Sequence, residues 1–197
     1  MDGLALAFTS GWASGVNAYL VVLVLGLADR VGQLDQVPDA LGRWEVLAVA
    51  GVLYATEFVV DKIPYVDSMW DAVSTAIRPT AGAVVGVLLA GDAGTPEQAV
   101  LGVVGGGTAL ASHLVKAGSR LAIHTSPEPV TNVVASLTED VAVLGVVWFA
   151  IEHPRGAAGI AGVLLATGLV VLYLAARLVR RGWRRWRRRE AAPARGG

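Results

Sequence analysis

The sequence predicts an all-α integral membrane protein, a polytopic bundle of about six transmembrane helices with proline-broken segments. Hydrophobic residues make up 54% of the 197-residue chain, and its mean hydropathy is +0.58. Charged residues make up only 16%, against roughly 25% in soluble domains. Long apolar runs recur along the chain, and the length allows one domain of about six crossings at roughly 20 residues each.

The first half of the sequence contains three apolar runs. The first covers about residues 4–28 and the second about residues 44–60. The third, PTAGAVVGVLLAG, begins at Pro79 and is too short to cross about 30 Å of hydrocarbon at about 1.5 Å per residue. It must therefore include residues 67–78 to cross the membrane. Crossing, re-entry and a position on the membrane surface all remain open for residues 65–78.

The second half contains three more runs. The fourth begins at TPEQAV, where Thr95 serves as a helix cap and Pro96 takes the first helical position. It extends to about residue 123, the fifth run covers about residues 133–151, and the sixth is GIAGVLLATGLVVLYLAA. The chain thus divides into a transmembrane bundle, residues 1–176, and a basic cytoplasmic tail, residues 177–197.

The tail carries most of the positive charge. From Arg177 onward there are nine arginines and one glutamate, whereas residues 1–176 hold seven Lys or Arg and fifteen Asp or Glu. A basic run directly after an apolar span favours contact with anionic lipid over nucleic-acid binding. The residues expected at the lipid surface are Arg181, Trp183, Arg184 and Trp186.

The distribution of basic residues also predicts topology. With six crossings and the tail inside, only three basic residues fall outside, and these are Arg30, Arg43 and Arg155. This asymmetry follows the positive-inside rule. The sequence therefore predicts a multi-pass protein of the cytoplasmic (inner) membrane with both termini cytoplasmic.

Two charged stripes follow helical spacing. Within residues 67–78 the stripe is mainly acidic, and within residues 113–120 it is basic. A solvated helix end is the simple explanation for such charges. However, an ionised side chain at membrane depth costs roughly 2.5 to 3.5 kcal/mol and normally faces the bundle interior, where it finds a partner. We therefore expect the stripes to face each other, with Asp71 or Asp67 near Lys116, Arg120 or His113.

Together with polar positions on neighbouring runs, these stripes define a candidate polar pathway. Its residues are Asn17, Glu57, Asp61, Asp67, Asp71, Arg78, His113, Lys116, Arg120, Asn132 and Glu139.

Other chemical signals are weak. Glycine pairs at i and i+4, such as Gly11 with Gly15 and Gly82 with Gly86, indicate close helix packing. The three histidines show no metal-ligand spacing, and no catalytic constellation stands out. We therefore expect no metal, no cofactor and no catalytic residue. Proline breaks in both halves are compatible with a weak internal repeat, either inverted or parallel.

The segments SGVNAYL, DKIPYVDSMWDAVSTAIRPTAGA, SHLVKAGSR and SPEPVTNVVASLTEDVAVLG occur in this order. In these segments the chain resembles the bacterial membrane family catalogued as domain of unknown function 4126, over about residues 8–150. The resemblance implies a compact multi-helix membrane protein in a bacterial membrane. It implies no activity, substrate or catalytic residue.

The leading functional interpretation is transport or permeation of a small polar or ionic solute, with proton coupling through Glu57, Asp71 and His113 as one form of it. A non-transporting lipid-binding or scaffold protein is the second interpretation. An enzyme acting on lipid-linked phosphates, held by Arg78, Lys116 and Arg120, is the third, although the sequence offers no matching nucleophile. The expected partners are the lipid bilayer, anionic lipid at the tail and a small polar solute, without nucleic acid. A homo-oligomer is compatible with the sequence.

Overall fold

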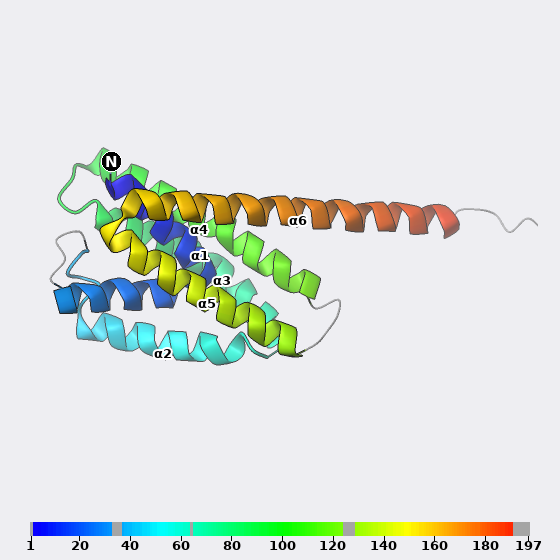
Figure 1. Cartoon of the computed structure of the whole chain (residues 1–197), viewed down its shortest axis with the longest axis horizontal. Helices are drawn as coiled ribbons and strands as arrows, with labels where there is room; N and C mark the ends of the chain where they lie inside the picture. The colour runs from blue at the N-terminus through cyan, green and yellow to red at the C-terminus, as the bar shows by residue number, and fades with distance from the viewer. Residues whose placement is uncertain (1, 33–36, 64, 124–128, 191–197) are drawn as a thin grey trace, which may run out of the picture.

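In the computed structural model, residues 2–32, 37–63, 65–123 and 129–190 are described, and they confirm an all-α fold. Six helices form one elongated bundle (Figure 1). They are α1 (Asp2–Gly32), α2 (Trp44–Val60), α3 (Val66–Leu89), α4 (Thr95–Ile123), α5 (Pro129–Glu152) and α6 (Pro154–Glu190). Within the described residues, five helices are long and apolar enough to cross a membrane, and the 17-residue α2 is outside that set.

Helix α1 reverses its direction in the middle of the bundle. Asn17 has φ −151° and ψ 95°, so the helical backbone stops there and α1 consists of two half-helices, residues 2–16 and 18–32. Figure 1 shows the first half running into the bundle and the second half returning toward the end from which the first half entered. Each half spans about 22 Å at about 1.5 Å per residue, less than the roughly 30 Å hydrocarbon core.

The packing partners of α1 agree with this reversal. Gly3, near the start of α1, lies against Leu101 of α4, six residues after that helix begins. Gly26, near the end of α1, lies against Leu41, which comes just before α2. Both helix starts lie at the same end of the bundle (Figure 1). The first apolar run therefore forms a re-entrant pair of half-helices instead of the single crossing expected for residues 4–28.

The two half-helices of α1 fill the centre of one half of the bundle. The helix is apolar on nearly all sides and largely buried, as expected for an element surrounded by protein. It packs against all five other helices. Its buried side chains, including Val21 and Leu25, join those of α5, such as Val143 and Val147, in the apolar core.

Glycine faces bring α1 and α3 close to α4. A Cβ at Gly11 or Gly15 would overlap with α4, and so would a Cβ at Gly82 or Gly86 of α3. These are the pairs whose spacing predicts close packing, and the structure confirms this role. Helices α1, α3 and α4 thus form a tightly packed scaffold.

Helix α3 includes the polar segment before the third apolar run, and Pro79 lies inside it. Its apolar side points outward, with Met69 72% exposed and Val73 59% exposed. Its charged side, including Asp71 and Arg78, is buried. The amphipathic pattern therefore turns the charges into the protein, as predicted.

Helix α6 extends well beyond the other helices (Figure 1). Its 37 residues span about 55 Å, nearly twice the hydrocarbon thickness. The chain start and the end of α6 lie at opposite ends of the bundle (Figure 1). Because α1 reverses, only the five later helices run from one end of the bundle to the other. This arrangement differs from the six crossings from which both termini were expected on one side.

Candidate functional site

Eight charged or titratable residues from α2, α3, α4 and the residue after α2 meet inside the bundle, beyond the point where α1 reverses. Each is at most 4% exposed. We call this group the charged cluster, and its members are Glu57, Asp61, Asp67, Asp71, Arg78, His113, Lys116 and Arg120.

Arg78 joins α3 to α2 within the cluster. One terminal nitrogen of its guanidinium donates to Glu57. The other lies 3.1 Å from a carboxylate oxygen of Asp71 and 2.8 Å from Nδ1 of His113. Two carboxylates and one imidazole therefore surround this buried arginine, which satisfies the requirement that a buried charge be paired.

Lys116 of α4 contacts three other helices, α1, α2 and α5, and the residue after α2. Its Nζ donates to Oδ2 of Asp61 at 2.9 Å and to the backbone carbonyl of Val16 in α1 at 2.9 Å. The same nitrogen lies 3.5 Å from both Glu57 and Glu139. The ammonium is thus held by three carboxylates and one carbonyl oxygen.

Arg120 completes the cluster one turn further along α4. Its guanidinium donates to Asp61 at 2.8 Å, to Glu139 at 3.1 Å and to Asp67 at 3.3 Å. Its Nε lies 3.8 Å from Asp71. The acidic and basic stripes therefore face each other across the interior, as predicted. They are not solvated helix ends.

The hydrogen bonds of His113 assign its tautomer. Thr75 donates its hydroxyl hydrogen to the carbonyl of Asp71, so its Oγ1 accepts from Nε2 of His113 at 3.0 Å. Arg78 donates to Nδ1. The imidazole is therefore neutral with its hydrogen on Nε2, and both of its nitrogens are engaged.

The reversal in α1 supplies backbone groups to the site. The carbonyl groups of Gly15 and Val16 accept from Arg78 at 3.4 Å and from Lys116 at 2.9 Å. These carbonyls end the first half-helix, where the helix dipole favours cations. The cationic side chains therefore satisfy backbone oxygens that a broken helix would otherwise leave unpaired.

Asn17 stabilises the start of the second half-helix. Its Oδ1 accepts from the backbone N–H of Leu20 at 3.0 Å, in the manner of an N-cap. Its Nδ2 donates to Asp140 of α5 at 3.0 Å. The side chain thus caps the helix and fixes the reversal against a neighbouring helix.

Asp61 lies just beyond the last residue of α2. Burial alone raises the pKa of its carboxyl, but the ammonium of Lys116 and the guanidinium of Arg120 outweigh burial and hold that pKa below its ordinary value. The two cations beside Asp61 therefore favour its ionised form.

The charges of the cluster do not cancel. Among the described residues of the cluster, four carboxylates, those of Glu57, Asp61, Asp67 and Asp71, face three cationic groups, those of Arg78, Lys116 and Arg120. With the neutral His113, the formal charge of the cluster is therefore −1. Glu139 and Asp140 add further negative charge at its partly exposed edge. The interior has a surplus of carboxylate.

Asn132 and Ser136 of α5 border the charged cluster and are equally buried. Nδ2 of Asn132 donates to the backbone carbonyl of Asp61 at 2.9 Å. Its Oδ1 and the Oγ of Ser136 have no hydrogen-bond partner among the groups that the structure describes. These oxygens remain available to a ligand.

A cavity of about 140 Å³ reaches the cluster from the side of α6. Lys116, Glu139 and Ser112 supply its polar lining, and Trp12 and Leu165 contribute to its apolar lining. The side chain of Glu139 is 22% exposed, compared with 2% for Lys116. The cavity therefore lies beside the more accessible edge of the cluster.

All eleven predicted pathway residues lie in or beside the cluster, while their role in a pathway remains a prediction. Sequence reasoning missed Asp140, Thr75 and the carbonyls at the α1 reversal. Asp140 follows Glu139 directly and could have been included on that basis. The other contributions depend on three-dimensional contacts that no local pattern indicates.

The lipid-surface candidates lie on the extended part of α6. Arg181 and Trp183 are exposed, whereas the side chains of Arg184 and Trp186 are outside the described part of the structure. The described residues contain no group of three or more His, Cys, Asp or Glu side chains suited to a metal ion.

Comparison with known proteins supplies one match. A family model described as "Domain of unknown function (DUF4126)" matches residues 4–174. Neither the comparison with curated proteins nor that with solved structures gives a match.

Proposed function

Because the chain belongs to the DUF4126 family, whose description assigns no function, we propose one from the geometry of the charged cluster: the protein moves a small cationic or polar solute across the membrane. The observation that carries this proposal is the meeting of a re-entrant helix end with buried charges. Interrupted helices inside membrane proteins are tolerated where they are buried in protein or line a water-filled cavity. In transporters, such helix ends typically bind substrate and coupling ions.

The charge balance supports a cation in preference to an anion. Arg78, Lys116 and Arg120 each contact at least two carboxylates, so none is left to hold a phosphate group. The surplus of carboxylate also attracts positive charge. These contacts weigh against an enzyme that binds lipid-linked phosphates through the same three residues.

The size of the cavity supports a small solute. At about 30 Å³ for each water in the liquid, a cavity of about 140 Å³ holds a few waters or a partly hydrated ion. Its polar lining connects Glu139 with Lys116. An extended or bulky substrate does not fit this space.

Reconstitution tests the proposed function. Purified protein in liposomes should produce an electrical or tracer signal when a gradient of sodium, potassium or protons is imposed, and not when the only cation is choline. The variant Glu139→Gln should reduce this flux because it removes the accessible carboxylate. Thr138→Val is the matched control, because Thr138 is exposed on α5 and bonds only to the backbone of its own helix. Absence of flux for every small cation and for small polar solutes would contradict transport.

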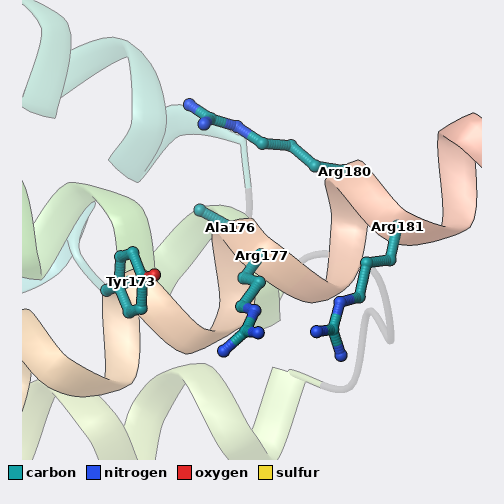
Figure 2. Close-up of a pocket in the computed structure, with 5 residues that line it drawn as sticks. All are labelled: Tyr173, Ala176, Arg177, Arg180 and Arg181. Atoms are coloured by element: carbon teal, nitrogen blue, oxygen red, sulfur yellow. The ribbon is translucent and has the colours of Figure 1, made fainter.

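We further propose that the extended end of α6 binds anionic lipid. Figure 2 shows Arg177 and Arg181 pointing to one side of the helix and Arg180 to the other. With Tyr173 and Ala176 they line a groove of about 390 Å³. Tyr173 lies about 19 residues into the helix, close to the interface of a bilayer about 20 helical residues thick, where aromatic and basic side chains favour headgroups.

Truncation tests lipid binding by α6. Deleting residues 182–197 should leave the melting temperature in detergent nearly unchanged, because the described part of this segment, residues 182–190, extends beyond the bundle (Figure 1). It should weaken binding to anionic lipid, since each basic residue near such a surface contributes about 1 kcal/mol. Native mass spectrometry or lipid-overlay titration with phosphatidylglycerol and phosphatidylcholine measures the difference. Equal binding of both lipids by the full chain would contradict the proposal.

A further inference from the structure

Four buried oxygen atoms belong to residues at the end of α2 and at the start of α5. They are Oε2 of Glu57, Oδ1 of Asp61, Oδ1 of Asn132 and Oγ of Ser136, and none has a hydrogen-bond partner among the described groups. Each of the four residues is at most 2% exposed. Such atoms cost free energy in a protein interior unless a ligand or water satisfies them.

The backbone brings these oxygens together. Glu57 and Asp61 are four residues apart, one turn along α2 and its cap, and Asn132 and Ser136 have the same spacing on α5. The hydrogen bond from Asn132 to the carbonyl of Asp61 joins the two pairs. Asp61 and Asn132 are therefore in contact, and Glu57 and Ser136 lie one turn away from them along their own helices.

We propose that these four oxygens form a binding site for one monovalent metal cation, with sodium as the test ion. The role of this cation as the coupled or carried ion of a transporter rests on the function proposed above. The binding of the cation does not depend on that function.

The neighbouring charges fit a single monovalent cation. Arg78 and Lys116 contact the other oxygen of Glu57, and Lys116 and Arg120 contact the other oxygen of Asp61. Each carboxylate thus keeps one oxygen turned away from the cationic side chains. The surplus of carboxylate in the cluster and at its edge favours a cation at these oxygens.

The donor types favour a metal ion over a bound proton. A bound proton needs only one acceptor oxygen. The neutral oxygens of Asn132 and Ser136 would therefore contribute nothing to the binding of a proton. A metal cation that gives up its hydration shell needs several oxygens, and carboxylate, amide and hydroxyl oxygens are hard donors suited to it.

Thermal unfolding of the purified full chain in detergent tests the site, with intrinsic tryptophan fluorescence as the readout. The melting temperature is measured at one ionic strength in sodium, potassium and choline chloride. A ligand that binds only the folded state stabilises it, so we expect sodium at about 100 times its Kd to raise the melting temperature by about 5 °C or more over choline. Potassium should have a smaller effect.

Ser136→Ala is the decisive variant. Its hydroxyl has no partner among the described groups, so the protein should keep its melting temperature in choline and need about tenfold more sodium for half of the maximal shift. Asn132→Ala should also weaken the sodium response. Thr138→Val, which removes a hydroxyl from the outer side of the same helix, should respond as the wild type does.

Two results would overturn the site: equal melting temperatures in the three salts, or a sodium shift that Ser136→Ala and Asn132→Ala leave intact. Equilibrium dialysis with radioactive sodium provides a second readout that does not depend on unfolding. Both measurements are made without a membrane. Sodium binding without flux in liposomes would therefore refute the proposed transport and support the binding site. Flux without sodium binding would refute the binding site and support transport.

Discussion

Lys116 and Asp61 form an ion pair that water scarcely reaches, whereas Arg155 and Asp2 form one at the surface. The two pairs have similar nitrogen to oxygen distances, 2.9 and 3.0 Å. The first pair is 2% and 3% exposed, and the second is 73% and 58% exposed. The difference in burial decides what each pair contributes.

Neutralising one member of the buried pair should be strongly destabilising. Lys116→Gln or Asp61→Asn alone leaves an uncompensated buried charge, and we expect each to cost about 3 to 5 kcal/mol. The double variant should cost clearly less than the sum of the two. Unfolding in detergent, analysed as a double-mutant cycle, measures the coupling.

The exposed pair is the control for this cycle. Asp2→Asn, Arg155→Gln and their combination should each change stability by less than about 1 kcal/mol, because exposed ion pairs are solvated and screened. Small additive effects at both pairs would mean that the cluster is hydrated and not buried.

The sequence predicted the residues of the cluster better than their pairing. Helical spacing placed Asp71 and Arg120 on inward faces, and the two are within 3.8 Å. Lys116, expected near Asp71 or Asp67, pairs instead with Asp61 and Glu57. Helical spacing determines the side of the helix on which a residue lies. The position of that residue along the axis of a neighbouring helix depends on the axial shift between the two helices.

At the scale of helices, glycine decides how closely α1 approaches α4. At Gly15, a Cβ would overlap with the side chain of Ser112 and the carbonyl of Ala109, whereas a Cβ at Gly51 would meet nothing within 4 Å. Both positions are helical, so their intrinsic helix propensities are similar.

Alanine at these two glycines should therefore have opposite effects. Gly15→Ala should destabilise the protein by about 1 to 3 kcal/mol through overpacking. Gly51→Ala should be neutral or stabilise it by up to about 1 kcal/mol, because alanine favours helix more than glycine does. Melting temperatures in detergent provide the comparison, and a destabilised Gly51→Ala with an unaffected Gly15→Ala would contradict the packing.

The reversal of α1 is the element that the sequence did not reveal. Residues 4–28 are mainly apolar, with only Thr9, Ser10, Ser14 and Asn17 as small polar residues, and no proline occurs among them. The break is stabilised by Asp140 and Lys116, which lie 100 or more residues further along the chain. Hydropathy and local breakers contain no information about such distant partners.

At the scale of the whole molecule, the path of α1 changes the expected topology. One reversal followed by five passes places the start of α1 and the end of α6 at opposite ends of the bundle (Figure 1). The loops keep the sides that the basic residues predict, because only the N-terminus moves. From the positive-inside rule we then expect the arginine-rich end of α6 on the cytoplasmic side and the start of α1 on the outer side.

Reporter fusions test this topology. A cytoplasm-active reporter should work at the C-terminus and fail at the N-terminus, and a reporter active outside should show the reverse. A fusion within the loop between α4 and α5 provides an internal control, because it should report the cytoplasmic side. Two cytoplasmic termini would instead support six crossings and contradict the reversal.

The reversal at Asn17 also has a consequence for biogenesis. A half-helix of about 22 Å cannot settle across the bilayer alone, and the carbonyls at its end need Lys116 and Arg78. Both residues are synthesised long after residue 17. We therefore expect this half-helix to reach its final position only after α3 and α4 have been inserted into the membrane.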